Sequence, residues 1–335
     1  MPAHARLPSQ VDGCGTAGGY RVIAGEGVGL HWWSRQDVVS LARLPVGFAL
    51  AWLAPEQRWE VIGQAIASRR AHKRAAWVAG EAAWIRRIAG DRLDEPAARS
   101  AVIELIGAFR IRQLQFMRAL RPGSWSPPVR LEGREHADRA ITSGKGVILW
   151  ASPFVFSALM TKVTCARLGL PIMHLSRWLH GTARSRLGMP ILNGYQQRAE
   201  NRFLEERVVI GKGDAGVAAT RRLATRLKAN GIVTITVAAE GSGRVELPFL
   251  DGRLRLANGA IKLARQTGAA LIPTTTIRHA DGCFVTVLDA PIAVGAGAGG
   301  MQEAALQMAG ILERTVLQTP GQFFWRDGIV AAAED

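Results

Sequence analysis

The chain has 335 residues, of which 48% are hydrophobic, so it is not a mainly disordered protein and can bury a sizeable core. Lysine and arginine number 42 against 27 acidic residues, and the resulting charge of +15 favours anionic partners such as lipid head groups, nucleic acid or acidic carrier proteins. A genome rich in G and C is an alternative source of many arginines and carries no functional meaning.

The N-terminal part and the cysteines bear on location. Residues 1–30 are polar and glycine-rich, without the apolar stretch of a signal peptide, and we expect them to be poorly ordered. Cys14, Cys165 and Cys283 are isolated, which indicates reduced thiols in the cytoplasm. Ten tryptophans, several of them near arginines, suit a membrane interface, where indole rings lie at the depth of the head groups.

Residues 31–128 are predicted to form a basic, tryptophan-rich helical region at a membrane interface. The apolar segment 38–55 is interrupted by Arg43 and Pro45 and falls short of the roughly 20 apolar residues of a membrane span. It predicts either a helix in the membrane interface or an ordinary helix covering the core. The candidate membrane anchors are Trp32, Trp33 and Trp52.

Further helical patterns follow this segment. A long helical region begins at Pro55, and a second helix covers about residues 96–120. Basic residues late in a helix also complement its dipole, so part of their charge has a structural reason. Residues 121–128 form the clearest linker, and we place a domain boundary there.

From residue 129 to 330, apolar runs of strand length alternate with helical patterns. This alternation predicts an α/β domain with a largely parallel central sheet covered by helices. Strands are expected at 144–151, 170–174, 231–237, 269–278 and 283–288. Helices are expected at 155–168, 214–230, 257–267 and 301–317.

The strand 231–237 leads directly into the segment Ala-Ala-Glu-Gly-Ser-Gly-Arg, residues 238–244. Loops at this end of a strand usually hold the ligand of an α/β sheet. Gly241 and Gly243 let backbone N–H groups approach an anion, while Ser242 and Arg244 add donors for phosphate oxygens. Glycine-rich turns also occur for purely structural reasons, so this loop does not by itself establish a phosphate site.

Several motifs follow one another in a recognisable order. They are Ala-Glu-Gly-Ser-Gly-Arg at 239–244, Leu-Pro-Phe-Leu-Asp-Gly at 247–252, Thr-Gly-Ala-Ala-Leu-Ile-Pro at 267–273 and Thr-Pro-Gly-Gln-Phe-Phe-Trp at 319–325. Together they resemble the lysophospholipid acyltransferase superfamily, specifically its late acyltransferases of lipid A biosynthesis, the lauroyl- and myristoyltransferase-like branch. The resemblance covers about residues 100–330 and implies a glycerolipid acyltransferase-like fold.

The resemblance also implies a reaction and a binding site. An acyl chain would pass from an acyl carrier protein or coenzyme A thioester to a hydroxyl of a phosphorylated glycolipid. The acceptor's phosphate would be held by a set of residues comprising Arg177, Glu240, Gly241, Ser242 and Arg244. No cofactor is implied, and the seven histidines show no spacing typical of a metal site. The expected location is peripheral, on the cytoplasmic face of the inner membrane.

The sequence departs from the family at the catalytic pair. There the family has a histidine that takes the proton of the acceptor hydroxyl and, five positions later, an acid that orients its ring. The corresponding positions just after the first strand are Pro153 and Ala158, or, shifted by one residue, Ser152 and Ser157. Neither alignment supplies a base.

Three functions therefore stay open. The first is a transferase with a substituted mechanism, in which Ser152 or Ser157 replaces the pair and His174, at the end of its strand, or Glu240 acts as base; a serine needs its own activator. The second is an inactive acyltransferase-like protein that binds anionic lipid or a partner. The third, nucleic-acid binding by the basic helices of 59–121, lacks any recognisable binding motif and is the least favoured.

Overall fold

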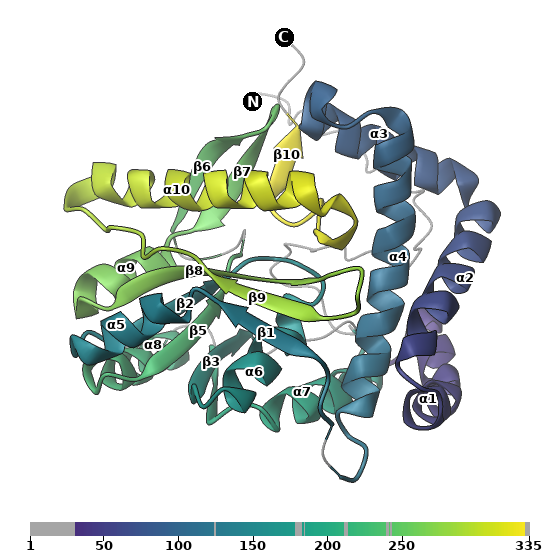
Figure 1. The fold of residues 1–335 in the computed structure, drawn as a ribbon, viewed down its shortest axis with the longest axis horizontal. Helices are drawn as coiled ribbons and strands as arrows, with labels where there is room; N and C mark the ends of the chain where they lie inside the picture. Colours follow the sequence, from purple (N-terminus) through teal and green to yellow (C-terminus); the bar gives the residue numbers. More distant parts are fainter. Residues whose placement is uncertain are drawn as a thin grey trace, which may run out of the picture.

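The computed structural model describes residues 31–123, 125–177, 183, 185–210, 214–238, 241 and 243–331. Residues 1–30, expected to be poorly ordered, lie outside this part of the chain. Helices form the first part of the described chain and stand beside the sheet (Figure 1). They are α1 (Arg35–Leu53), α2 (Gln57–Lys73), α3 (Ala75–Ala89), the short 3-10 helix η1 (Gly90–Arg92) and α4 (Glu95–Arg118).

Local signals set the ends of these helices. Ser34 caps α1 by accepting a hydrogen bond from the Asp37 backbone N–H at 3.0 Å, and the helix stops shortly before Pro55. Asp94 caps α4 in the same way. The long helical region expected after Pro55 is divided in two, because the backbone of Arg74 leaves the helical conformation at φ −133° and ψ 40°.

A seven-stranded sheet forms the core of the rest of the chain. Its strands are β1 (Val129–Glu132), β2 (Val147–Ala151), β3 (Ile172–Arg177), β4 (Glu206–Ile210), β5 (Ile232–Thr236), β8 (Ala270–Arg278) and β9 (Phe284–Leu288). The order is β1-β9-β8-β2-β5-β3-β4. Strands β8, β2, β5, β3 and β4 are parallel to one another, whereas β9 is antiparallel to β8 and β1 is parallel to β9. The predicted α/β fold with a largely parallel sheet is confirmed.

Helices cover both faces of this sheet. They are α5 (Arg134–Thr142), α6 (Ser157–Arg167), α7 (Gly194–Asn201), α8 (Asp214–Lys228), α9 (Gly259–Thr267) and α10 (Gly297–Gln318), with a π-helical turn η2 (Met189–Asn193) before α7. On β2, Ile148 and Trp150 pack with α8 and α9, whereas Val147 and Leu149 pack with α5 and α6. The apolar run of β2 is therefore buried on both faces, as is usual for a central parallel strand.

A second, three-stranded antiparallel sheet was not expected from the sequence. It consists of β6 (Arg244–Phe249), β7 (Gly252–Ala257) and β10 (Ile329–Ala331), in the order β10-β7-β6. The motif Leu-Pro-Phe-Leu-Asp-Gly at 247–252 covers the end of β6 and the turn into β7. The β6–β7 hairpin turns through Leu250, whose φ is 51°. The sheet packs against α10 and α3 (Figure 1).

The helical region and the sheet share part of their core. Ile88 of α3 and Val102 of α4 belong to one hydrophobic cluster with Trp150 of β2 and with Phe154, which follows that strand. β1 begins at Val129, directly after the expected linker. The division into two domains at residue 128 stays a prediction.

Candidate functional site

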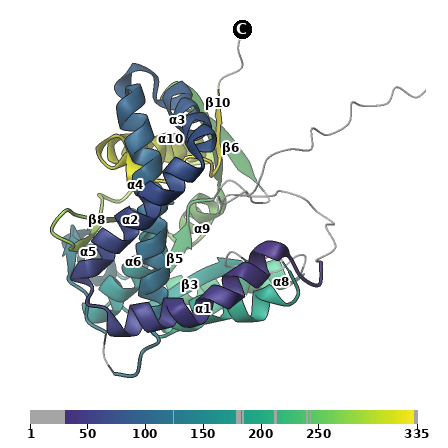
Figure 2. The ribbon, with the colours of Figure 1, turned by 90° about the vertical axis from the view of Figure 1, so that its right-hand side faces the viewer.

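The carboxyl ends of the parallel strands meet at one edge of the main sheet, next to the N-terminal helices (Figure 2). β8 ends beside α2, where Arg278 forms an ion pair with Glu60 and its backbone N–H donates to Oε1 of Gln322 at 2.8 Å. Gln322 lies in the short 3-10 helix η3 (Pro320–Gln322). This edge is where open α/β sheets usually bind ligands.

The loop after β5 is closed onto the start of α9 by backbone hydrogen bonds. The Ala257 N–H donates to the Ala238 carbonyl at 2.7 Å, and the Asn258 N–H donates to the Gly243 carbonyl at 3.1 Å. Gly241 has no room for a side chain, because a Cβ atom there would lie 2.8 Å from Cβ of Ala257. A glycine at 241 therefore lets the loop pack closely against the start of α9. The approach of its N–H groups to an anion stays a prediction.

Gly243 faces polar groups of α9. A Cβ atom on Gly243 would lie 2.6 Å from Oδ1 of Asn258 and 3.0 Å from Nζ of Lys262. Asn258 is the N-cap residue of α9, and Lys262 lies about one turn into the helix. The sequence predicted a helix start near Asn258, but Lys262 was missed; its position four residues after the cap is the signal that would have found it.

The electrostatics of this cradle, defined as Gly241, Gly243, Asn258 and Lys262, favour an anion. The N-terminus of a helix carries a partial positive charge, and α9 has no acidic residue in its first turn. Lys262 adds a full positive charge where the helix dipole disfavours a cation, so helix stability does not explain it. Glycines, a helix N-terminus and a cation together form an arrangement suited to a phosphate group.

The other expected binding residues are only partly placed. Arg244 is exposed at the start of β6, beside the cradle. Arg177 is exposed at the end of β3, the strand next to β5 in the sheet, so both arginines lie at the same edge. Glu240 and Ser242 fall outside the described residues.

The two candidate catalytic serines are buried, and both form hydrogen bonds with β8. Ser152 follows β2 directly, is fully buried, and has its Oγ 2.7 Å from Oγ1 of Thr275. Ser157, the first residue of α6, accepts a hydrogen bond from the Thr276 backbone N–H at 3.3 Å. Further buried hydroxyls extend this network between α6, β8 and β9, namely Thr161, Thr164 and Thr286. Ser152 thus joins the end of β2 to β8, and Ser157 joins α6 to β8.

His174 lies further from the edge than expected. The prediction that its strand ends there is wrong, because β3 continues to Arg177 and leaves His174 in its middle, opposite Thr234 of β5 and Arg207 of β4. Its side chain is buried, at 4% exposure. The structure thus brings Arg177, rather than His174, to the carboxyl edge of the sheet.

Pro153 and Ala158 occupy the places where the resemblance expects a histidine and an acid. Pro153 is buried at the carboxyl end of β2, and Ala158 lies in the first turn of α6. The Ala158 carbonyl accepts a hydrogen bond from Nζ of Lys162, one turn along the helix. No group of three or more His, Cys, Asp or Glu side chains suited to a metal ion occurs among the described residues.

A buried cluster of three charged side chains lies between α6, α7 and β4 and was not predicted from the sequence. Glu200 of α7 accepts from Nζ of Lys162 at 3.1 Å and from Nη2 of Arg207 at 2.6 Å, and all three side chains are at most 9% exposed. Arg207 Nη1 also donates to Oγ of Ser176 at 2.9 Å. Burial lowers the pKa of Lys162, and the Glu200 carboxylate opposes this effect. One carboxylate thus bridges two cations and joins α6, α7 and β4.

Comparison with known proteins gives one finding on the family. The model of the family described as bacterial lipid A biosynthesis acyltransferase matches residues 112–326, which is more than half of the chain. The matched span runs from within α4 to the segment before β10, and so includes the whole seven-stranded sheet and the cradle. A search of curated proteins found no match.

Proposed function

The chain belongs to the family of bacterial lipid A biosynthesis acyltransferases, and we propose that it transfers an acyl group from an acyl carrier protein or coenzyme A thioester to a hydroxyl of a phosphorylated glycolipid. The observation that carries the proposal is the cradle at the N-terminus of α9, with Lys262 beside Gly243. The acceptor's phosphate would bind there, with Arg244 and Arg177 as further donors.

The reaction itself is a substitution at the thioester carbonyl. The acceptor hydroxyl oxygen forms the new C–O bond, the C–S bond breaks, and the thiol leaves with a proton that a base has taken from the hydroxyl. With Pro153 and Ala158 in place of the usual pair, this base has to be a different group. His174 is the proposed base, with Ser152 or Ser157 in the place of the usual pair. All three are buried, so a substrate reaches them only after the edge opens.

Association with an anionic membrane surface is part of the proposal, and α1 supports it. Val39, Val46 and Leu53 recur every seven residues and lie on one side of the helix, at 39%, 71% and 82% exposure. Trp32 and Trp33, before the helix, are also exposed. A stripe of this kind with flanking indoles suits the head-group region of the inner membrane.

Two observations refine this membrane-facing role. Trp52 does not share it, because its ring packs inside the helical region and its Nε1 donates to the Met117 carbonyl at 2.9 Å.

Three arginines from different helices, Arg43 of α1, Arg70 of α2 and Arg110 of α4, lie near enough to affect one another. Burial, and then the charges of Arg70 and Arg43, lower the pKa of Arg110 to about 10. No helix among the described residues is long and apolar enough to cross a membrane.

A second function is favoured by a specific observation. Ser152 and Ser157 are engaged in buried hydrogen bonds, and Pro153 and Ala158 carry no catalytic group. An inactive protein that binds anionic lipid or a partner through the cradle is consistent with that chemistry.

Mass spectrometry of total lipids from strains with and without the gene separates the two functions. A transferase predicts a lipid lighter by one acyl group in the deletion strain, restored by the wild type and not by Lys262→Gln, with Lys228→Gln as a matched exposed control. An unchanged lipid profile, while the protein still binds vesicles of anionic lipid, would overturn the transferase and leave the binding protein.

A further inference from the structure

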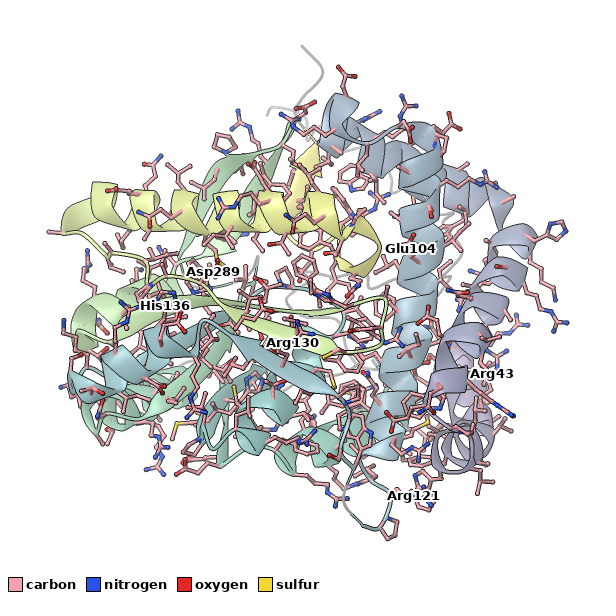
Figure 3. All side chains as sticks on the ribbon, in the orientation of Figure 1. Arg43, Glu104, Arg121, Arg130, His136 and Asp289 are labelled. Atoms are coloured by element: carbon pink, nitrogen blue, oxygen red, sulfur yellow. The ribbon has the colours of Figure 1, made fainter. Side chains whose placement is uncertain are left out.

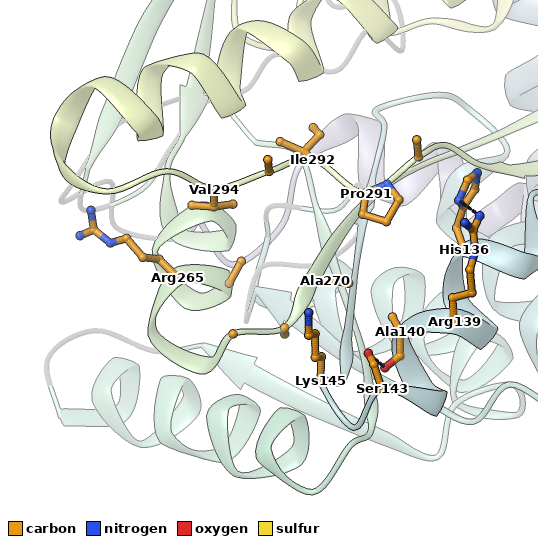
Figure 4. Close-up of a pocket in the computed structure, with 15 residues that line it drawn as sticks. His136, Arg139, Ala140, Ser143, Lys145, Arg265, Ala270, Pro291, Ile292 and Val294 are labelled. Carbon is orange, nitrogen blue, oxygen red and sulfur yellow. Dashed lines mark hydrogen bonds between the residues drawn. The ribbon is translucent and has the colours of Figure 1, made fainter.

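A cavity lies at the edge of the sheet opposite the cradle (Figure 4). It has a volume of about 600 Å³, a size typical of small-molecule sites. Its walls come from α5, the turn between α5 and β2, the end of α9, the start of β8 and the segment 290–294 after β9. It shares no residue with the cradle.

About half of the surface of this pocket is apolar, and this half is built from small side chains. They are contributed by Ala140, Ala264, Ala269, Ala270, Pro291, Ile292 and Val294, with further alanines at 290 and 293. An apolar surface of this size can cover a ring or another non-polar part of a ligand. Five lining side chains are polar, namely His136, Arg139, Ser143, Lys145 and Arg265, and those that gather at one end would fix one end of the ligand (Figure 4).

These polar groups are mainly cationic. Figure 4 shows Lys145 rising into the pocket towards Pro291, with His136 and Arg139 together at one end. Arg139 Nη2 lies 3.0 Å from Nδ1 of His136. A guanidinium group only donates, so Nδ1 accepts and the ring keeps its N–H at Nε2 as a further donor. Arg265 differs, because its guanidinium leaves the pocket to donate to the Gly297 carbonyl at 3.2 Å.

Negative charge at the pocket does not balance these cations. No carboxylate lines the pocket, and among the described residues none lies within 4.0 Å of Lys145 or Arg139. Asp289 lies close to His136 on the neighbouring segment (Figure 3). Burial raises the pKa of Asp289, while the nearby Arg314 opposes the effect. The C-termini of α5 and α9 add partial negative charges, which are smaller than the full charges of Lys145 and Arg139.

We propose that this pocket binds a phosphorylated small molecule of nucleotide size. Its phosphate would lie between Lys145 and the Arg139–His136 pair, and its non-polar part against the alanines of α9 and β8 and against Ile292. Lysine and arginine bind phosphate oxygens by charge-assisted hydrogen bonds. Arg139 donates from Nε to the Glu135 carbonyl at 3.1 Å and from Nη2 to His136, so its Nη1 is the group left to donate to a phosphate. The site is separate from the proposed acyl-transfer edge and goes beyond that function.

The test compares three probes, namely ADP, inorganic phosphate and adenosine, at constant ionic strength. Binding is measured by titration calorimetry and by the shift in melting temperature of the full chain. The variant Lys145→Gln/Arg139→Gln removes two cations from the pocket. The control Arg221→Gln/Lys228→Gln removes two exposed cations from α8 and leaves the same net charge.

The proposal expects ADP to bind the wild type and the control equally, and the pocket variant at least about tenfold more weakly, since two charge-assisted bonds are lost. Inorganic phosphate should bind more weakly than ADP. Equal binding of ADP to all three proteins would show general attraction to a basic surface and would overturn the proposal. The proposal would also fail if adenosine, which has no phosphate, bound as well as ADP. It would fail too if the pocket variant lost stability with no change in its affinity for ADP, because the two cations would then serve only to balance the helix dipoles.

Discussion

The substitution Lys262→Gln tests whether Lys262 serves phosphate binding or the stability of the fold. Removing the charge takes one charge-assisted hydrogen bond from the proposed phosphate cradle, worth about 1.5–3 kcal/mol. That loss corresponds to an affinity for the phosphorylated acceptor about 10- to 100-fold weaker. The same substitution removes a cation from the first part of α9, where it opposes the helix dipole, so the free energy of unfolding should stay equal or rise by about 0.3–1 kcal/mol.

The assay measures both quantities on the same protein. Titration calorimetry gives the affinity for a phosphorylated glycolipid in detergent and for its dephosphorylated counterpart, and urea denaturation gives the free energy of unfolding. Lys262→Arg should retain most of the affinity. Lys228→Gln, in the last turn of α8, removes an exposed cation that the helix dipole favours, so it should lower stability slightly and leave the affinity unchanged.

Two results would refute this reasoning. Unchanged affinity of Lys262→Gln for the phosphorylated lipid would remove Lys262 from the binding site, whatever its effect on stability. Equal weakening for the phosphorylated and dephosphorylated lipids would show that Lys262 contacts another part of the acceptor.

Three further substitutions or labels test other parts of the structure. Glu200→Gln should lower the free energy of unfolding by about 3–5 kcal/mol in urea denaturation, because two buried cations lose their carboxylate; a loss below about 1 kcal/mol would contradict the buried cluster. Arg110→Met should raise stability, since the fall of the Arg110 pKa from 12.5 to about 10 sets an upper limit of about 3 kcal/mol on its unfavourable charge; a clear loss would show that its hydrogen bond to Oε1 of Gln113 outweighs this cost. Burial raises the pKa of the Cys165 thiol to about 12, so iodoacetamide at pH 8 should label the half-buried Cys283 and spare Cys165 in the native protein, as mapped by peptide mass spectrometry; native labelling of Cys165 would contradict its burial.

Much of the fold could be predicted because the sequence patterns that mark its strands and helices lie within short segments of the chain. β2 and β5 are apolar runs of strand length, and β8 and α9 lie within a residue or two of their expected bounds. The elements that were missed carry weak local patterns. β4 reads Glu-Arg-Val-Val-Ile at the edge of the sheet, and β6 contains a proline and alternates with charged residues in a hairpin exposed on one side.

The candidate site was predictable in part for the same reason. Gly241 and Gly243 stand out in the sequence because they directly follow a buried strand, and at such a place glycine allows the loop to pack closely against its neighbours. The position of Lys262 next to Gly243 depends on how α9 folds back onto the loop, which no local pattern specifies. The placement of His174 was wrong because β3 runs three residues further, and strand ends are set by pairing with β4.

The sequence by itself determined the fold class, the family and the loop that ends β5, because strand periodicity, glycine punctuation and motif order are all properties of neighbouring residues. Only the tertiary structure decided that Ser152 and Ser157 are buried against β8, that Glu200 bridges Lys162 and Arg207, and that Lys145 and Arg139 border a pocket at the far edge of the sheet. These relations join residues tens of positions apart in the chain or on different elements. They arise from the packing of helices on a sheet, whose geometry depends on the whole core rather than on any one segment.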